Sequence, residues 1–513
     1  MKKLVLLFTL LLGTLFQTQA QTLKFKVDNV QDTTVYLIKY VGSGTYYADT
    51  AFMENGNVSF NGAKQTPGIL GLFIPGKRYF DFIYNNEDVS LETAAPNFME
   101  NLKVKKSAEN KVFNTYLQFI QSQKEKSQKL SSKLQTASDE EKTKINAELS
   151  GINDEVIAYQ NNLIKENPDK LVSKIIKMTM EVDIPENVSS SEDRRAMYTY
   201  LLEHYFDNID LQDDRLVNTA IIQNKLEKFL SKNFIMQNPD TIMQYISPVL
   251  NQLEPGSMMY RFFVTKVTAH FQKSKIMGMD KGFNQMILNY YCTQNANGEY
   301  NANWMTKQKV EELCEETIKK MTTVLGNIPP NISLRDTTDQ NWKDFYSIDA
   351  EYTILYFWDP ECGHCKKETP KLGKLYREKL KERNVEVFAI GKATGEDFEA
   401  WKSFIKKHDL TFVNVGLTNS LFEDATENPY QFIPKYTTAQ SLNYQDTYNI
   451  FSTPQVFVLD KDKKIVAKKL SIAQLEDFID KKQGKEDAEK LFDVEEEKKR
   501  MEEQQERAEE AQE

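Results

Sequence analysis

The stretch that decides the fold of the C-terminal part runs from Thr353 to Pro370 and reads TILYFWDPECGHCKKETP. Five of its first six residues are apolar or aromatic and predict a buried β-strand, and the residues that follow the cysteines show helical spacing. Cys362 and Cys365 therefore lie where a strand turns into a helix. The first turn of a helix has unpaired N–H groups and the positive end of the helix dipole, which favour a thiolate over a thiol.

This position gives the two sulfurs different predicted roles. We predict that Cys362, at the helix start, is the nucleophile, because the thiolate is the reactive form of cysteine. Cys365 lies one helical turn away, close enough to close a redox-active disulfide and to displace a substrate held on Cys362. We therefore predict that Cys365 is the resolving thiol.

Two other uses of a C-x-x-C sequence fit less well. A closed zinc site needs four ligands, and no second pair with suitable spacing appears in the sequence. Attachment of c-type haem needs a histidine directly after the second cysteine, where Lys366 stands. The sequence therefore predicts no metal and no organic cofactor, since the two sulfurs carry the electrons.

The residues around this stretch alternate between β and α patterns, as an α/β domain requires. We predict such a domain over residues 326–480. Its further expected elements are a strand, a helix, a hairpin and a closing helix, at residues 385–390, 398–405, 455–467 and 470–479.

Several of these motifs together resemble the thioredoxin fold: Phe357-Trp358, the C-G-H-C sequence, Pro370, and Thr453-Pro454 before the hairpin. The Cys-Lys-Lys-Glu sequence that ends at Glu368 resembles the exported thiol-disulfide oxidoreductases of the TlpA/ResA type. The resemblance covers residues 326–480. The long β and helical part before it resembles the N-terminal extensions of some exported bacterial members.

The resemblance implies roles for particular residues. Cys362 attacks and Cys365 resolves, and Thr453-Pro454 carries a cis-proline that faces the disulfide and offers backbone to an extended substrate. Glu368 matches a glutamate that is thought to influence thiol protonation. Its alternative role is that of an exposed acidic residue favoured by the helix dipole, and both stay open.

Two departures from thioredoxin bear on the chemistry. Tyr356 stands where thioredoxin has a buried aspartate, so Glu368 or water must serve if Cys365 needs a base. His364 lies between the cysteines, and its imidazole can stabilise the thiolate and raise the reduction potential, with about 30 mV corresponding to about 1.4 kcal/mol. Alternatively, His364 is an exposed spacer.

The function that the resemblance implies is disulfide exchange with protein substrates, in the reductive direction, as in reductases of the cytochrome c maturation type. A membrane thiol relay is the implied electron donor. The alternatives are a disulfide oxidase or isomerase, and an envelope scaffold in which the domain mainly binds partners. A peroxidase function fits less well. Peroxiredoxins share the fold but place their peroxidatic cysteine in a motif that differs from the C-G-H-C pair.

The N-terminus predicts export. Lys2 and Lys3 precede an apolar run from Leu4 to Phe16, and a signal peptide over residues 1–20 would be cleaved after Ala20. An uncleaved anchor is the alternative. We expect the protein in an oxidising space such as a bacterial periplasm. The formal net charge of −10 gives no electrostatic support for binding nucleic acid, and nothing in the sequence indicates the oligomeric state.

The predicted fold class is therefore a multidomain α+β protein. A β-rich module over residues 21–100, expected to be antiparallel, precedes a helical region over 101–325 with breaks at Pro185, Pro239 and Pro255. A narrow apolar seam from Ile145 to Leu163 predicts a helical hairpin, whose second arm begins with a capping box of Ser138 and Glu141.

The remaining features suggest structural roles. Residues 481–513 are rich in charged residues and are expected to form a solvated helix or a frayed tail, or else a helix that pairs with a partner. Cys292 and Cys314 form either a structural disulfide or two separate buried thiols. His204 and His270 stand alone among apolar and aromatic neighbours and are expected to be structural rather than ligands.

Overall fold

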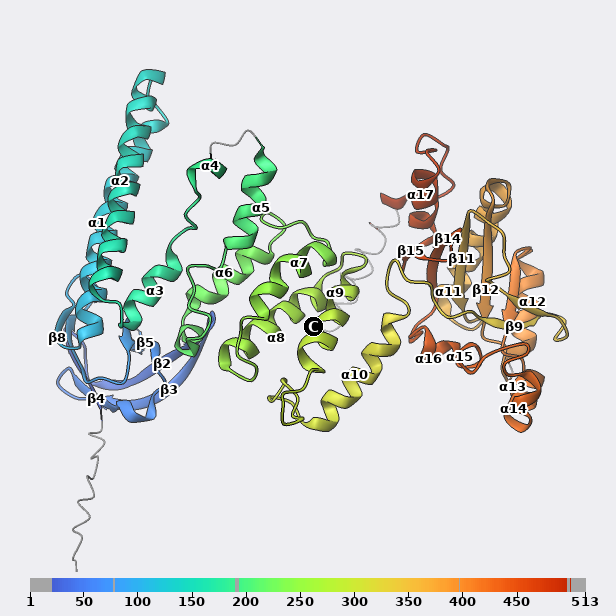
Figure 1. The fold of residues 1–513 in the computed structure, drawn as a ribbon, viewed down its shortest axis with the longest axis horizontal. Coiled ribbons are helices and arrows are strands. Elements are labelled where there is room, and N and C mark those ends of the chain that lie inside the picture. Colours follow the sequence, from blue (N-terminus) through green and yellow to red (C-terminus); the bar gives the residue numbers. More distant parts are fainter. Residues whose placement is uncertain (1–20, 77–78, 190–192, 396, 496–498, 500–513) are drawn as a thin grey trace, which may run out of the picture. The chain divides into compact units, whose positions relative to one another are not determined.

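The computed structural model describes residues 21–76, 79–189, 193–395, 397–495 and 499. The predicted signal peptide lies outside these residues. The chain divides into two compact units (Figure 1). One comprises the chain up to Met236 together with Gln244–Phe263, and the other comprises Gln237–Met243 together with the chain from Val264 onward. The boundaries expected near residues 100 and 325 fall inside these units and stay predictions.

The first unit begins with two four-stranded sheets whose alternating apolar residues share one core, which includes Phe25, Leu37, Leu72 and Phe82. One sheet has the order β4-β1-β7-β8 and the other β3-β2-β5-β6. The strands are β1 (Thr22–Asp28), β2 (Thr33–Val41), β3 (Gly44–Met53), β4 (Asn57–Asn61), β5 (Gly68–Phe73), β6 (Phe80–Tyr84), β7 (Val89–Ala94) and β8 (Lys103–Lys106).

The expected antiparallel β module is confirmed, with one exception: β1 and β7 pair in parallel. The residues of strand β3 are mostly exposed or half-buried, so this strand lacks a clear alternation of buried and exposed residues.

The predicted helical hairpin is confirmed by α1 (Ala108–Leu134) and α2 (Asp139–Glu166). Phe119 stacks on Tyr159 with ring centroids 4.0 Å apart, which joins the two arms. Ser138 and Glu141 form the expected capping box at the start of α2.

Further helices follow, as the sequence predicted: α3 (Leu171–Thr179), α4 (Glu186–Ser189), α5 (Arg194–His204), α6 (Ala220–Leu230), α7 (Pro239–Leu250), α8 (Met258–Lys273), α9 (Met279–Met286) and α10 (Lys307–Met321). Pro239 begins α7 rather than breaking a helix, because proline fits the first turn, where its missing N–H costs nothing. Within the described ranges, no helix is both long and apolar enough to span a membrane.

The second unit contains a seven-stranded sheet of order β10-β9-β13-β12-β11-β14-β15. Strands β11 and β12 run parallel, as do β12 and β13, whereas β14 is antiparallel to β11. The strands are β9 (Ser333–Asp336), β10 (Trp342–Asp344), β11 (Tyr352–Trp358), β12 (Val385–Gly391), β13 (Val413–Gly416), β14 (Gln455–Asp460) and β15 (Ile465–Lys468).

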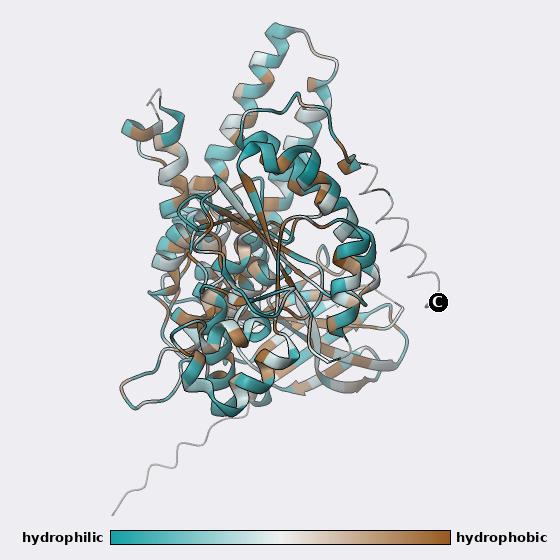
Figure 2. Ribbon diagram, turned by 90° about the vertical axis from the view of Figure 1, so that its right-hand side faces the viewer, coloured by the Kyte–Doolittle hydropathy of each residue, from teal (hydrophilic) through white to brown (hydrophobic). Residues whose placement is uncertain are grey.

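Helices cover both faces of this sheet, so its central strands are apolar on both sides (Figure 2). Residues from α11 (Gly363–Leu375), α12 (Asp397–Lys407) and α17 (Ile472–Lys482) share a core with alternate residues of β11. The other residues of β11 pack with an insertion between β13 and β14, formed by α13 (Asn419–Glu427), α14 (Pro429–Phe432), α15 (Ala439–Leu442) and α16 (Tyr444–Thr447).

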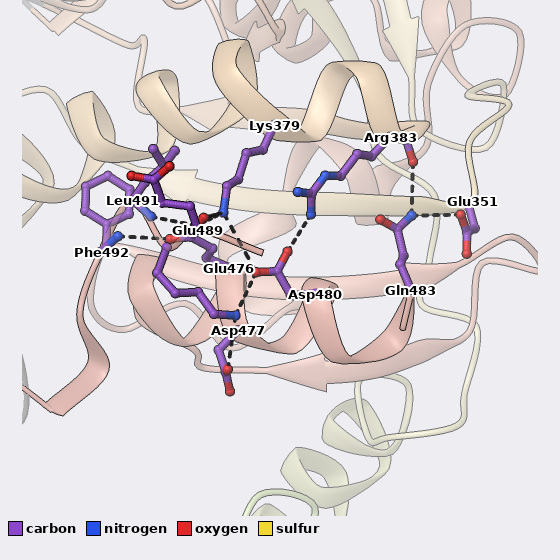
Figure 3. Close-up of polar contacts among 11 residues, drawn as sticks. Glu351, Lys379, Arg383, Glu476, Asp477, Asp480, Gln483, Glu489, Leu491 and Phe492 are labelled. Atoms are coloured by element: carbon purple, nitrogen blue, oxygen red, sulfur yellow. Dashed lines mark hydrogen bonds and ion pairs between the residues drawn. The ribbon is translucent and has the colours of Figure 1, made fainter. Parts of the chain in front are cut away.

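The start of the expected tail is docked on this unit rather than solvated (Figure 3). Helix α17 runs to Lys482, and the chain then folds back so that Leu491 and Phe492 pack against the core. The carboxylate of Glu476, which is only 1% exposed, accepts hydrogen bonds from the backbone N–H of Leu491 at 2.8 Å and of Phe492 at 3.0 Å. Lys379 pairs with the same carboxylate.

Candidate active site at the start of helix α11

The cysteine pair lies between the end of β11 and the first turn of α11. Cys362 is the N-cap of α11, and the backbone N–H of Cys365 points at its sulfur with an N···Sγ distance of 3.5 Å. Burial raises the pKa of the Cys362 thiol, but hydrogen bonds with the side chain of Thr453 and with the backbone N–H groups of Cys365 and His364 lower the pKa by more. Cys362 is half-buried, so its sulfur combines lowered pKa with access to solvent.

Cys365 has the opposite environment. Its side chain is fully buried in the core that β11 shares with α11, α12 and α17. Burial raises its pKa to about 12, although the backbone N–H of Asp359 donates to its sulfur at 3.5 Å. At neutral pH the Cys365 sulfur is therefore a thiol. It is more deeply buried than the more acidic sulfur of Cys362.

The loop before β14 completes the site. The Thr453-Pro454 peptide bond is cis, as the resemblance implied. The Cys362 thiol donates a hydrogen bond to the carbonyl oxygen of Thr453, with an Sγ···O distance of 3.2 Å. Four of the six predicted site residues, Cys362, Cys365, Thr453 and Pro454, are thus brought together.

The other two predicted residues occupy less direct positions. The side chain of His364 is exposed, and its backbone N–H rather than its imidazole acts on the Cys362 sulfur. Glu368 forms an ion pair with Lys371 at 2.6 Å through one carboxylate oxygen. Its other oxygen is buried and has no hydrogen-bond partner among the residues that the structure describes. Glu368 is therefore not the fully exposed residue of the alternative interpretation.

Tyr356 lies inside the core where thioredoxin would have a carboxylate. Its hydroxyl is 2.9 Å from the Oγ1 atom of Thr369, and both side chains are fully buried. Burial raises the pKa of Tyr356 well above its usual value, so this phenol stays protonated. Tyr356 can share a hydrogen bond, but it cannot accept a proton from Cys365 as a carboxylate would.

Asp359 is the residue that the sequence interpretation missed. Besides the contact of its backbone with Cys365, its carboxylate accepts from the backbone N–H of Glu361 at 2.8 Å and lies 3.6 Å from the Nζ atom of Lys392. It holds the turn between β11 and α11 in place. Its position directly after the buried strand was the only sequence signal for this role.

The residues outside this site have structural partners. Cys292 and Cys314 form a disulfide, which decides between the two alternatives for them. His204 pairs with Asp207 at 2.7 Å and stacks on Tyr200, so its expected structural role is supported. In the part of the chain that the structure describes, no group of three or more His, Cys, Asp and Glu side chains could hold a metal ion.

Comparison with known proteins gives family matches to three parts of the chain. Residues 325–468 match the model of the AhpC/TSA family. The preceding parts match two domains of unknown function, DUF4369 over residues 22–113 and DUF5106 over residues 121–324.

Individual relatives match the same C-terminal part. The thiol-disulfide oxidoreductase ResA of Bacillus cereus is 28% identical over 160 residues, which cover 31% of this chain and 78% of that protein. The soluble secreted antigen MPT53 of Mycobacterium tuberculosis is 30% identical over 88 residues, covering 17% of this chain and 48% of that protein. A solved domain of a possible thiol-disulfide isomerase from Cytophaga hutchinsonii is 32% identical, covers 31% of this chain and 94% of that chain, and has a TM-score of 0.24.

These matches and the strand-to-helix cysteine pair agree with each other. The C-terminal part of this chain is similar to the thioredoxin-like thiol-disulfide oxidoreductases of the ResA type.

Proposed function

We propose that the protein is a periplasmic reductase that exchanges disulfides with other proteins through Cys362 and Cys365. The observation that carries this proposal is the difference between the two sulfurs. Cys362 is accessible and has a lowered pKa, whereas Cys365 is buried directly behind it with a raised pKa. An accessible thiolate can capture a substrate, and a buried thiol reacts only with the sulfur above it.

The proposed reaction has two exchange steps. The Cys362 thiolate attacks one sulfur of a substrate disulfide, and a mixed disulfide forms while the other substrate sulfur leaves and takes a proton. Cys365 then loses its proton and attacks the Cys362 sulfur, which forms the Cys362–Cys365 disulfide and releases the second substrate thiol. Two electrons pass from the pair to the substrate. An external dithiol must then reduce the pair again, and a membrane thiol relay could supply these electrons.

The second step needs an acceptor for the proton of Cys365. Tyr356 cannot serve, because its own pKa is raised well above the usual value. Glu368 is the nearest carboxylate on the same helix, and one of its oxygens has no partner among the described residues. We assign the acceptor role to Glu368, acting directly or through water. Substitution by glutamine should slow the release of a trapped substrate more than its capture.

The cis-proline loop provides the proposed substrate contact. The Thr453 carbonyl lies 3.2 Å from the Cys362 sulfur, where the substrate sulfur must arrive. An extended substrate segment can therefore lie along Thr453-Pro454 while its cysteine reacts. Clients of cytochrome c maturation are one candidate substrate class, and export is supported by a relative, MPT53, whose name calls it secreted.

The experiment that tests the proposal is trapping with the Cys365→Ser variant. Without the resolving thiol, substrates should stay covalently bound to Cys362, and mass spectrometry of the adducts identifies them. The Cys362→Ser variant is the matched control and should trap none and lose insulin reduction. If the first variant traps nothing during oxidising growth, or if cells with Cys362→Ser function normally, a scaffold role replaces the enzyme role.

A further inference from the structure

One aromatic side chain near the cysteine pair has no role in the chemistry described so far. Phe451 is 84% exposed, although it lies in a segment whose other large side chains are buried. Tyr448 is 2% exposed and donates its hydroxyl to the carbonyl of Pro330. Ile450 packs on the core beside β11, and its backbone N–H donates to the carbonyl of Gln445 at 2.8 Å.

This arrangement holds Phe451 outward from a fixed base. The residues before it are anchored in the core, and the cis Thr453-Pro454 bond and strand β14 follow it. The ring is therefore presented by an ordered segment. An aromatic ring held in this way loses little conformational freedom when it binds, which is the property of a good contact residue.

The position of Phe451 relates it to the reacting sulfur. It precedes Thr453 by two residues, a distance of at most about 7 Å along the chain. The Thr453 carbonyl is 3.2 Å from the Cys362 sulfur. A substrate cysteine that reacts with Cys362 thus brings its own neighbours, one or two residues away, within reach of the ring.

The exposed residues beside Cys362 in the chain are polar or glycine. Glu361 and His364 are exposed, and Glu361 forms an ion pair with Lys366 at 3.0 Å. Phe451, next to the cis-proline loop, therefore offers an apolar contact that these neighbours of Cys362 do not. A ring of this kind is buried favourably only against another apolar surface, because a charged neighbour would lose its hydration.

We propose that Phe451 is a specificity-determining residue that selects protein substrates with an apolar side chain next to the reacting cysteine. This inference rests on the proposed exchange reaction and adds the class of sequence that it prefers. Segments with this composition are normally buried in folded proteins. The preferred substrates are therefore unfolded or partly folded chains with an exposed disulfide.

The experiment compares two peptides that contain the same disulfide and differ only in leucine or serine beside the reacting cysteine. The full-length reduced protein should have a kcat/KM about 10-fold higher for the leucine peptide, as expected for a hydrophobic contact of this size. In Phe451→Ala this ratio should fall to about 1, and Phe451→Leu should keep part of it. The near-UV circular dichroism spectrum shows that each variant is folded.

Tyr430 provides the matched control, because it is an equally exposed aromatic residue, at 93%, in the same insertion. Its helix α14 packs through Phe432 on Trp342 of β10, at a ring distance of 6.2 Å. Strand β10 is the edge of the sheet, four strands from β11, which corresponds to about 19 Å. Tyr430→Ala should therefore keep the wild-type ratio.

The outcomes separate this inference from the proposed function. If the wild-type protein reduces both peptides equally, or if Phe451→Ala keeps the preference for leucine, the role of Phe451 is refuted and the exchange reaction stands. The role is also refuted if Tyr430→Ala loses the preference to the same extent. If the wild-type protein reduces neither peptide, the exchange reaction and the role of Phe451 are both overturned.

Discussion

The difference in acidity between the two sulfurs can be measured by alkylation of the reduced protein. The pKa of Cys362 lies below the ordinary value of 9.0, so at pH 8 at least about 9% of this sulfur is thiolate. The pKa of Cys365 is about 12, so only about 0.01% of it is ionised at the same pH. The thiolate fractions of Cys362 and Cys365 at pH 8 therefore differ by a factor of about 900 or more. Iodoacetamide reacts with thiolates, so this factor affects the labelling rates directly.

Intrinsic reactivity reduces this difference, because a more basic thiolate is a better nucleophile. With a Brønsted slope of about 0.45, three units of pKa return a factor of about 20 to Cys365. For a Cys362 pKa just below 9.0, acidity alone therefore predicts that Cys362 is labelled about 40-fold faster, and the complete burial of Cys365 increases the ratio. The rate at Cys362 should rise with pH and reach half of its maximum below pH 9, where half of the sulfur is thiolate.

The assay is timed labelling at several pH values, followed by acid quenching and mass spectrometry of the peptide that contains both cysteines. The Cys362→Ser variant isolates the slow reaction of Cys365. Equal labelling rates for the two sulfurs, or faster labelling of Cys365, would refute the assignment of attacking and resolving roles. An apparent pKa of Cys362 at or above 9 would refute the stabilisation of its thiolate by the start of α11.

Two further predictions concern the stability of the second unit, which contains all four tryptophans, so that urea unfolding can be followed by fluorescence. Glu476→Gln should lower its free energy of unfolding by about 3 kcal/mol, because Lys379, only 11% exposed, loses the closer of its two carboxylate partners, while Asp480 stays at 3.8 Å. Asp477→Asn on the same helix, a control with a side chain 33% exposed, should cost about 1 kcal/mol or less, and equal losses would contradict the prediction. Replacing Cys292 and Cys314 together by serine should cost about 3 kcal/mol, since their disulfide closes a loop with a sequence separation of 22; no loss would show that it does not constrain the unfolded chain.

The sequence was sufficient for the parts of the fold that have a strong periodic pattern. The apolar run that became β11 is buried on both faces, and only a central strand explains such a continuous run. The apolar seam of α2, which faces α1, repeats over about five turns, and α2 begins with a recognisable capping box. The proposed roles of Cys362 and Cys365 follow from their place at a strand-to-helix junction, which the sequence alone predicts.

Other elements could not be predicted because their identity depends on tertiary contacts. Strands β9 and β13 have four residues each, and β9 becomes a strand by pairing with β10 and β13. Four residues cannot display a period clearly. The segment around Leu491 is strongly charged, and its docking depends on one buried carboxylate, Glu476, from the preceding helix. Composition alone does not reveal that such a partner exists.

Tyr356 shows a different limit of sequence interpretation. The departure from thioredoxin is visible in the sequence, but the sequence does not show that the tyrosine hydroxyl forms a hydrogen bond with Thr369 and lies in the core with Cys365. A buried phenol satisfies its hydrogen-bonding group without introducing a charge. The site thus keeps an uncharged polar group in the core with Cys365, and the proposed proton acceptor is Glu368.

The lowered pKa of Cys362 bears on the direction of electron flow. Stabilising its thiolate stabilises the reduced pair, so it raises the reduction potential and weakens the pair as a reductant. The same stabilisation, however, allows a donor of modest reducing power to keep the pair reduced in an oxidising compartment. A reductase needs a pair that its donor can keep reduced. An oxidase needs the raised reduction potential, together with an acceptor of electrons that oxidises the pair again. The resting state of the pair in the cell therefore distinguishes them: a coupled reductase keeps Cys362 and Cys365 as thiols, and an oxidase keeps them as a disulfide.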